Sequence, residues 1–334
     1  MADLVVGMDV SPLVQTGAGT HRYVTGLVDA MRATGEVVVR PYSFGGAGRV
    51  AAVARDVVWY PATLPRRAAR DRVDILHCPT QRGPVASEVP LVVTIHDLAV
   101  LRMPQAFNPW TRSYSRLMVP RVIRASRRVI AVSEFTASEL VALLRVPREK
   151  IAVVHSGVAP VFSRDGDAAD GDYVLAVATI EPRKNLERLV RAFLQTRLRC
   201  ELRIVGAAGW GRVRLAGEGV RLLGRVSDDE LARLYRGARC VAYVSLYEGF
   251  GLPVLEAMAC GAAVVAADLP PLRDIAGDAV VFVDPLDTAS IAAGLREAQV
   301  RRVDLAQAGR DRARGFSWQR AARGTIDVYR GALA

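Results

Sequence analysis

The feature that most constrains the fold is an alternation of short β-rich runs with longer amphipathic stretches of helical period. This pattern is typical of βαβ units that build a parallel sheet. In the first half it predicts strands at Leu4–Val10, Val37–Pro41, Ile75–His77, Leu91–Ile95, Arg128–Val132 and Ile151–His155, with helices at Thr20–Ala33 and Thr111–Ala125. In the second half it predicts strands at Tyr173–Ala178, Glu201–Val205, Val220–Leu222, Cys240–Ser245, Ala263–Ala266 and Val280–Val283, with helices at Leu186–Thr196, Asp228–Arg236, Pro253–Cys260 and Ser290–Glu297.

A polar segment between the two halves, SRDGDAADGD at residues 163–172, has no periodicity and reads as a linker. The chain has 334 residues, more than one hydrophobic core usually serves. We therefore expect an α/β protein of two Rossmann-like domains, residues 1–165 and 166–317, facing each other across a cleft. Ligands of such sheets bind outside the carboxyl ends of the strands.

Composition excludes several classes of protein. Leu4–Val10 carries Asp9 and follows no basic segment, so it is expected to be a strand and not a signal peptide. No apolar run approaches the roughly 18 residues that span a bilayer. The four cysteines are widely spaced, without a CxxC pair, which indicates reduced, buried thiols in a cytoplasmic protein.

The formal net charge of +11 indicates an anionic partner. Nucleic acid is not expected, because the sequence has no zinc-finger spacing, no aromatic RNA-binding strand and no extended basic arm. Nearly all of the positive charge is arginine; the two lysines are Lys150 and Lys184.

The most informative segment is EGFGLPVLE, in which Glu248 and Glu256 flank a turn between a strand and a helix. Pro253 suits the first position of that helix and Gly261 its end, which would place Glu256 in the first turn. The free amides of Phe250, Gly251 and Leu252 at a helix N-terminus form an anion site that suits a diphosphate. Alternatively, Glu256 only complements the helix dipole.

A second strand–loop–helix segment, TIEPRKNLERLV, carries Arg183 and Lys184 just before Asn185, the expected N-cap. A guanidinium beside an ammonium at a helix N-terminus can clamp a phosphate and offset charge growing on a departing diphosphate. The alternative is an ordinary solvated basic pair.

Weaker candidates lie in other loops. Gly206 follows a strand, so backbone could approach a ligand there, and the backbone at Arg225–Val226 could bind a nucleobase.

Gly17 and Gly19 precede a helix that Thr20 is expected to cap; they do not form GxGxxG but could wrap a diphosphate or a sugar. His96 lies just beyond the carboxyl end of a strand, in the expected cleft, although a lone histidine is more often structural. Two capping boxes are expected, one at Ser227 with Glu230 and one at Ser133 or Thr136 with Glu139.

Together these segments resemble the retaining GT-B glycosyltransferases of the GT4 family, most specifically through the E-x7-E motif Glu248–Glu256. Further similar pieces are GAGTHRY, TIHDL, AVSEFTASEL, EPRKN, GRVSDDEL and FSWQRAARGTIDVY. The resemblance implies an N-terminal acceptor domain, joined by a final helix at about 318–334, and a C-terminal nucleotide-sugar donor domain. It implies that Arg183 and Lys184 bind the donor diphosphate.

By the same resemblance, Glu248 would hold hydroxyls of the transferred sugar, Glu256 the ribose, and His96 the sugar near the reacting carbon. The implied reaction is metal-independent front-face displacement with no cofactor; Asp228–Asp229 begin a helix and do not form a metal-binding pair in the cleft. The segment after HDL resembles a mannosyltransferase-like branch, which favours GDP-mannose as donor, while rhamnose or another hexose stays open.

The acceptor is left open among a glycan, a lipid-linked saccharide and a small molecule. The alternatives are an epimerase of the same fold, a non-catalytic sugar- or anion-binding protein and a nucleic-acid-binding protein. Basic residues at 64–72 and along the helix containing Arg112, Arg116, Arg121 and Arg124, with Arg128 beyond it, predict either peripheral contact with an anionic membrane or an ordinary solvated face.

Overall fold

The computed structural model describes residues 4–15, 19–46, 48–209, 211 and 213–334. The chain separates into two compact units. Unit 1 contains Met1–Pro104, Pro109–Gly157 and Ser317–Ala334, and unit 2 contains Gln105–Asn108 and Val158–Phe316. The main change of unit therefore falls at Gly157, a little before the sequence-predicted boundary at residue 165. None of the described helices is both long and apolar enough to cross a bilayer.

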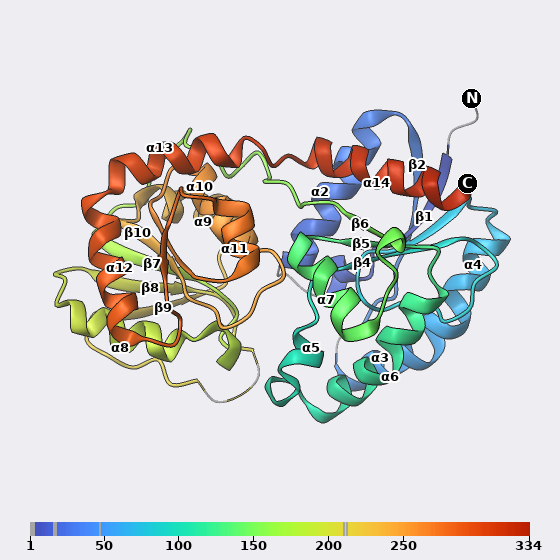
Figure 1. Cartoon of the computed structure of the whole chain (residues 1–334), viewed down its shortest axis with the longest axis horizontal. Coiled ribbons are helices and arrows are strands. Elements are labelled where there is room, and N and C mark those ends of the chain that lie inside the picture. Colours follow the sequence, from blue (N-terminus) through green and yellow to red (C-terminus); the bar gives the residue numbers. More distant parts are fainter. Residues whose placement is uncertain (1–3, 16–18, 47, 210, 212) are drawn as a thin grey trace. The chain divides into compact units, whose positions relative to one another are not determined.

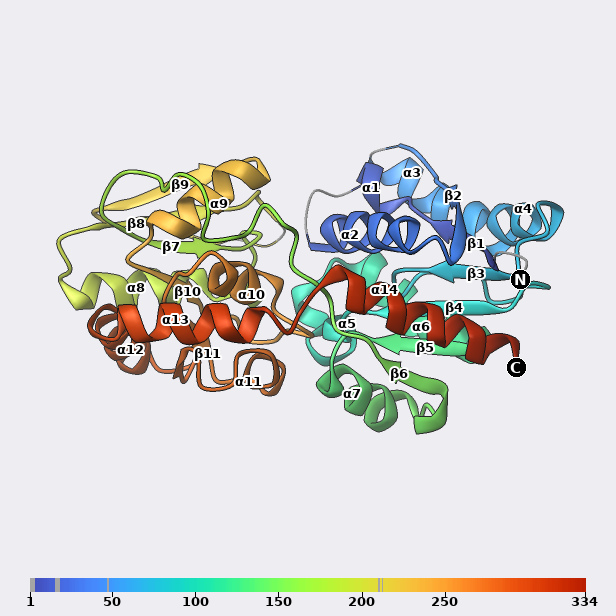
Figure 2. The ribbon, with the colours of Figure 1, turned by 90° about the horizontal axis from the view of Figure 1, so that it is seen from above.

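Unit 1 is built on a parallel six-stranded sheet in the order β2-β1-β3-β4-β5-β6. Helices cover both faces of it, with α2 and α14 on one side and α6 and α7 on the other (Figures 1 and 2). The strands are β1 Leu4–Asp9, β2 Val37–Tyr42, β3 Ile75–Cys78, β4 Leu91–Ile95, β5 Arg128–Ala131 and β6 Ile151–Val153. The helices are α1 Pro12–Gln15, α2 Gly19–Thr34, α3 Arg49–Ala54, the π-helix η1 Arg55–Thr63, α4 Leu64–Arg70, α5 Ala99–Arg102, α6 Pro109–Ala125, α7 Glu134–Leu144 and α14 Trp318–Leu333, with short 3₁₀ turns η2 Pro104–Ala106 and η3 Arg148–Lys150.

The core of unit 1 contains a series of hydrogen-bonded polar side chains among its apolar ones. Every residue of β3 and β4 is buried, as expected for central strands covered on both faces. His77 lies within β3 without solvent exposure, with Nδ1 2.7 Å from the hydroxyl of Tyr329 on α14 and Nε2 2.9 Å from Thr94 Oγ1. Burial lowers the pKa of His77 to about 3, so the ring is neutral at neutral pH. These bonds fasten the C-terminal helix to the sheet of unit 1.

Unit 2 repeats the plan with a parallel sheet in the order β12-β11-β10-β7-β8-β9. Helices α8 and α12 pack together on one face, and α9 and α10 lie on the other (Figure 1). The strands are β7 Tyr173–Val177, β8 Glu201–Val205, β9 Val220–Gly224, β10 Cys240–Tyr243, β11 Val264–Ala267 and β12 Val281–Val283. The helices are η4 Pro182–Lys184, α8 Leu186–Thr196, α9 Asp228–Gly237, α10 Leu252–Ala259, α11 Pro270–Ala276, α12 Thr288–Val300 and α13 Arg302–Ala313.

The strand order reverses once in each sheet, and that reversal positions the candidate sites. In unit 1 the chain runs from β1 outward to β2 and then resumes at β3 on the other side of β1. In unit 2 it runs from β7 outward through β9 and resumes at β10 on the other side of β7. Loops that leave the carboxyl ends of the two strands at such a switch point diverge, which opens a place for a ligand.

All twelve predicted strands form, with ends that differ from the predicted ones by at most two residues. Details of the predicted caps differ from the structure. Ser133 caps α7 by accepting from the Thr136 amide, and the two oxygens of Glu139 accept from Arg102. Thr20 does not precede α2 but lies within its first turn. The four cysteines are free thiols, although Cys200 is only half-buried.

Candidate active site

The two segments singled out in the second half follow the two strands at the unit 2 switch point. The EPRKN loop follows β7 and ends in η4, while the YEGFG loop follows β10 and leads into α10. Their backbones are joined, because the Leu246 amide donates to the Arg183 carbonyl at 2.9 Å. Adjacent parallel strands thus bring together residues that are far apart in the sequence.

Asn185 strengthens this junction by a route that the sequence did not indicate. It stands directly before α8, as predicted, but its φ of 59° is left-handed and its side chain makes no cap bond. Capping requires an extended backbone that aims the side-chain oxygen at the first helical amides. The amide of Asn185 instead donates to the carbonyls of Val244, at 3.0 Å, and Pro285, at 2.7 Å. Asn185 therefore ties the two loops together, and its predicted capping role is wrong.

Lys184, Arg183 and Glu248 form the centre of the site. Lys184 Nζ lies 2.5 Å from Glu248 Oε1 and Arg183 Nη1 lies 3.4 Å from Oε2. The three side chains are only 8–12% exposed. Arg183 is held further by Glu181 at 2.8 Å and by the Tyr247 carbonyl at 2.9 Å. The basic pair is thus not an ordinary solvated surface pair.

The charges of this cluster are strongly coupled. Burial raises the pKa of Glu248, but the nearby Lys184 and Arg183 outweigh it and bring that pKa to about 2. Burial lowers the pKa of Lys184, and the Glu248 carboxylate opposes that shift. At neutral pH Glu248 is an acceptor of hydrogen bonds only, and it stands beside two cations that a ligand can share.

Tyr243, the last residue of β10, completes the cluster and was missed by sequence reasoning. Lys184 Nζ donates to its hydroxyl at 3.2 Å and lies 5.2 Å from the ring centroid. Lys184 donates hydrogen bonds to Tyr243 and Glu248. Its third N–H has no partner among the described residues. The signal available in the sequence was the position of a tyrosine at the end of a buried strand.

The turn before α10 has the predicted backbone but a different arrangement of its acids. Gly251 has φ 115° and precedes the first helical residue, Leu252, while Phe250 is buried with its ring against Phe316. Pro253 is consequently second in the helix and Glu256 lies in the second turn, not the first. Glu256 is 1% exposed and accepts from the Tyr235 hydroxyl at 3.2 Å. Since dipole effects fade beyond the first turn, the dipole explanation for Glu256 fails.

Gly206 and Val226 lie in two further loops of unit 2. Gly206 follows β8, and a Cβ there would stand 1.9 Å from the Ala178 carbonyl oxygen, so only glycine fits beside the loop that leaves β7. Val226 is half-buried and directly precedes Ser227, which caps α9 by accepting from the Glu230 amide. The Glu230 carboxylate pairs with Arg233 and does not complete the capping box. Neither position touches the lysine–glutamate pair by any recorded contact among the described residues.

The remaining candidates belong to unit 1. His96 directly follows β4, with Nε2 2.9 Å from the Pro79 carbonyl and its ring edge-on to Tyr23 at 4.6 Å. Burial lowers its pKa, so the ring is neutral, its Nε2 donates to Pro79 and its Nδ1 is an acceptor. Gly19 is the first residue of α2. Gly17 lies outside the described residues.

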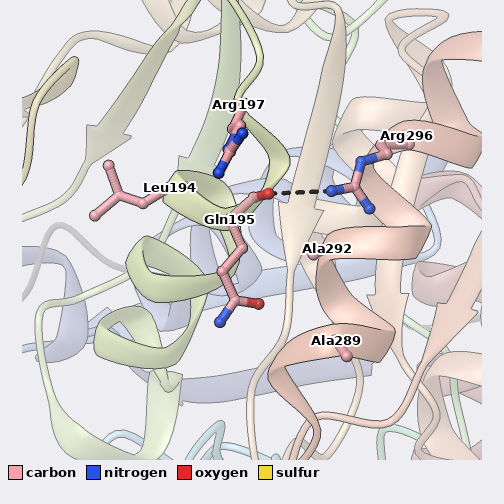
Figure 3. A pocket seen from close by; sticks show the side chains of 6 residues that line it. All are labelled: Leu194, Gln195, Arg197, Ala289, Ala292 and Arg296. Atoms are coloured by element: carbon pink, nitrogen blue, oxygen red, sulfur yellow. Dashed lines mark hydrogen bonds between the residues drawn. The ribbon is translucent and has the colours of Figure 1, made fainter.

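A hollow of about 480 Å³ in unit 2 contains none of these residues. It opens between the end of α8 and α12 and is lined by Leu194, Gln195, Arg197, Ala289, Ala292 and Arg296 (Figure 3). Arg296 donates there to the Gln195 carbonyl, which satisfies a helix-end acceptor and is a structural role. A smaller hollow of about 220 Å³ adjoins the Arg183 loop, with Glu181, Asn185 and Leu246 in its wall.

Comparison with known proteins decides the family. The model of glycosyl transferases group 1 matches residues 162–313, and that of Glycosyltransferase Family 4 matches residues 17–162. O-antigen chain mannosyltransferase B of Escherichia coli is 33% identical over 304 residues, which are 81% of this chain and 79% of that protein. This chain is a group 1 glycosyltransferase of the GT4 family.

Other relatives of this glycosyltransferase differ in their names. The D-inositol 3-phosphate glycosyltransferase of Nocardioides sp. is 28% identical, over 86% of this chain and 72% of that protein. Among solved structures, sucrose-phosphate synthase from Thermosynechococcus elongatus matches with a TM-score of 0.79 at 19% identity, covering 98% of both chains. Anabaena HepE, solved with UDP and glucose, matches with a TM-score of 0.69 at 16% identity, covering 98% of this chain and 99% of that one. These likenesses establish the GT-B fold.

Proposed function

We propose that this enzyme transfers a hexose, with retention of configuration and without a metal ion, from a nucleotide-diphosphate sugar. The observation that carries the proposal is the cluster of Lys184, Arg183 and Glu248 at the switch point of the unit 2 sheet. Two cations provide donors for a diphosphate, and an ionised carboxylate beside them provides acceptors for sugar hydroxyls. One cluster can thus hold both parts of such a donor.

In the proposed reaction the bond between the sugar C1 and the diphosphate oxygen breaks, and the acceptor oxygen bonds to C1 on the same face. The acceptor proton passes to the departing diphosphate. The free N–H of Lys184, the Arg183 guanidinium and the amides at the start of α10 offset the charge that grows on the leaving group. Glu248 fixes the sugar through its hydroxyls, and Glu256, oriented by Tyr235, is assigned to the ribose.

We assign His96 a contact with the transferred sugar. Nε2–H donates a hydrogen bond to the Pro79 carbonyl, so the neutral ring leaves Nδ1 to accept from a sugar hydroxyl. A neutral imidazole would orient the sugar without adding positive charge near a carbon that becomes electron-poor. Gly17, Gly19, Gly206 and the Val226 backbone are assigned to the donor on resemblance alone.

For the donor we favour GDP-mannose, because the relative in Escherichia coli that is 33% identical is named a mannosyltransferase. UDP-sugars are the second candidate class of donor, because HepE was solved with UDP and glucose. A panel of GDP-, UDP- and dTDP-sugars, assayed for nucleotide release and thermal shift, identifies the donor. Nucleotide release that persists in EDTA, with an α-linked product from an α-linked donor by NMR, is the expected result. Release from none of the donors, or an inverted product, contradicts the proposal.

The acceptor is proposed to be a glycan, free or lipid-linked. In support of a lipid surface, Arg112, Arg116, Arg121 and Arg124 of α6 are all exposed, and so are Val50 and Val57 on α3 and η1. Each near-surface arginine would contribute about 1 kcal/mol at an anionic bilayer. Sedimentation with anionic and neutral liposomes tests this. We expect binding to the anionic vesicles that weakens with salt, and equal partitioning would indicate an acceptor in solution.

A further inference from the structure

A second cluster of buried charges lies at the switch point of the unit 1 sheet. Asp9 ends β1, and its carboxylate accepts from Ser11 and, at 2.9 Å, from the Tyr60 hydroxyl. Arg82 lies in the loop that follows β3. Between them stands the π-helix η1, which presents Arg55 and Asp56. π-helical turns are rare and occur frequently at functional sites.

Asp56 is the hub of this cluster. Its side chain has no solvent exposure, and its carboxylate lies 3.3 Å from the Nε atoms of both Arg55 and Arg82. The indole Nε1 of Trp110 also donates to it, at 3.3 Å. Buried ion pairs of this kind add little to stability, because desolvation offsets their attraction. What the arrangement achieves is to fix the direction of two guanidinium groups and one indole.

This cluster reaches the surface at two stacked aromatic rings, Trp110 and Tyr114. Trp110 is 45% exposed and stacks on Tyr114, with ring centroids 6.2 Å apart and planes at 25°. The Arg82 guanidinium lies 5.5 Å from the Tyr114 ring centroid, and its side chain is 27% exposed. Within the described residues, the terminal nitrogens of Arg82 and the buried Tyr114 hydroxyl have no hydrogen-bond partner. Buried polar groups are normally satisfied, so the Tyr114 hydroxyl marks a place for a ligand or water beside the partly exposed Arg82.

We propose that Trp110, Tyr114 and Arg82 form a saccharide site, where a pyranose of the acceptor packs on the exposed indole. The apolar C–H face of a pyranose suits an aromatic ring, while its hydroxyls accept from the free guanidinium nitrogens. The inference rests on the proposed function, because it names the acceptor's chemistry. The mechanism there assigns no role to Trp110, Tyr114, Arg82 or Asp56.

The test is binding of simple sugars to unit 1 of the whole enzyme, measured by saturation-transfer NMR and titration calorimetry. The panel contains methyl glycosides of mannose, glucose, galactose, rhamnose and N-acetylglucosamine, with mannose 6-phosphate as an anionic sugar. We expect at least one to bind, with affinity at least about 10-fold weaker in Trp110→Ala and nearly kept in Trp110→Phe. Arg127→Gln, at an exposed arginine of the same unit to which no role is assigned, is the matched control and should bind normally. Stronger loss for mannose 6-phosphate in Arg82→Gln would indicate an anionic group on the acceptor.

The failure of this inference is distinguishable from failure of the proposed function. Trp110→Ala should keep the affinity for the donor nucleotide and its slow hydrolysis in the absence of acceptor, while the acceptor KM rises. If no sugar of the panel binds the wild type, or if Trp110→Ala binds as the wild type does, the saccharide site is overturned. If sugars bind at Trp110 but no nucleotide sugar is used, only the transferase proposal falls.

Discussion

Nζ of Lys184 and Oε1 of Glu248 lie 2.5 Å apart, although 64 residues separate them in the sequence. The contact exists because β7 and β10 are neighbours in the sheet, so the loops that follow them meet. Each side chain shifts the pKa of the other: Lys184 lowers that of Glu248, and Glu248 opposes the lowering of that of Lys184 by burial. Substitution of either should therefore alter the chemistry of both.

Removal of either cation should slow transfer more than it weakens binding of the free nucleotide. Arg183→Ala and Lys184→Ala should each lower kcat/KM by roughly 10-fold or more, because a leaving group gains charge in the transition state. Steady-state kinetics with a saturating acceptor measure this. Arg199→Ala, an exposed arginine of the same unit, is the control. Unchanged kcat/KM in both variants would exclude the clamp.

Tyr243→Phe removes one hydroxyl and keeps the ring beside Lys184. Loss of a single hydrogen bond to a charged group corresponds to about 1.5–3 kcal/mol, so kcat/KM should fall roughly 10- to 150-fold. Tyr173→Phe removes another buried hydroxyl of unit 2, one that donates to the Leu234 carbonyl, and should leave kinetics unchanged. Equal kinetics for Tyr243→Phe and wild type would show that the hydroxyl does not position Lys184.

The pH profile should report on Lys184. Burial lowers its pKa below the ordinary value of 10.5, and the clamp requires the protonated form. Activity should therefore fall as pH rises, at a pH below that expected for an exposed lysine. Lys184→Arg keeps its charge over this range, so its kcat/KM, although reduced, should lack this basic limb. A basic limb of the same position in both proteins would assign it to another group.

Acid should destabilise unit 1 through His77. Its folded pKa of about 3 lies below the unfolded value near 6.5, so the unfolded state binds the proton more readily. The contribution of His77 to the free energy of unfolding is present in full above pH 6.5 and is lost as pH falls toward 3. Between pH 7 and pH 5 this contribution should fall by about 2 kcal/mol. In His77→Gln the unfolding free energy should fall less over that interval, as measured by denaturant titration. Identical pH dependence in both proteins would contradict this.

Much of the fold followed from the sequence, because buried parallel strands are apolar runs that stand out from amphipathic helices. The pairing of Arg183 and Lys184 with Glu248 could be anticipated for the same reason, since both loops follow strands. Other features depend on tertiary contacts that leave no local pattern. Asn185 resembles an N-cap until the bonds to Val244 and Pro285 are known.

The residues of unit 1 were harder to predict. Arg55 and Asp56 are adjacent opposite charges and resemble a solvated pair, yet both are buried. The π-helix that carries them includes Pro61, a residue that normally argues against a helix interior. Trp110 and Tyr114 are four residues apart in α6, a spacing that is also typical of the buried face of a helix. Only the three-dimensional arrangement shows that they meet Arg82 at the surface.

The measurement that tests the central claim most directly is the kcat of Glu248→Gln with the identified donor. The amide keeps the size of the side chain but removes the charge that accepts sugar hydroxyls and pairs with Lys184. We predict a fall in kcat of roughly 10²-fold or more, with far-UV circular dichroism and thermal unfolding close to wild type. A well-folded variant with kcat within a few-fold of wild type would contradict the proposed role of the Lys184–Glu248 pair.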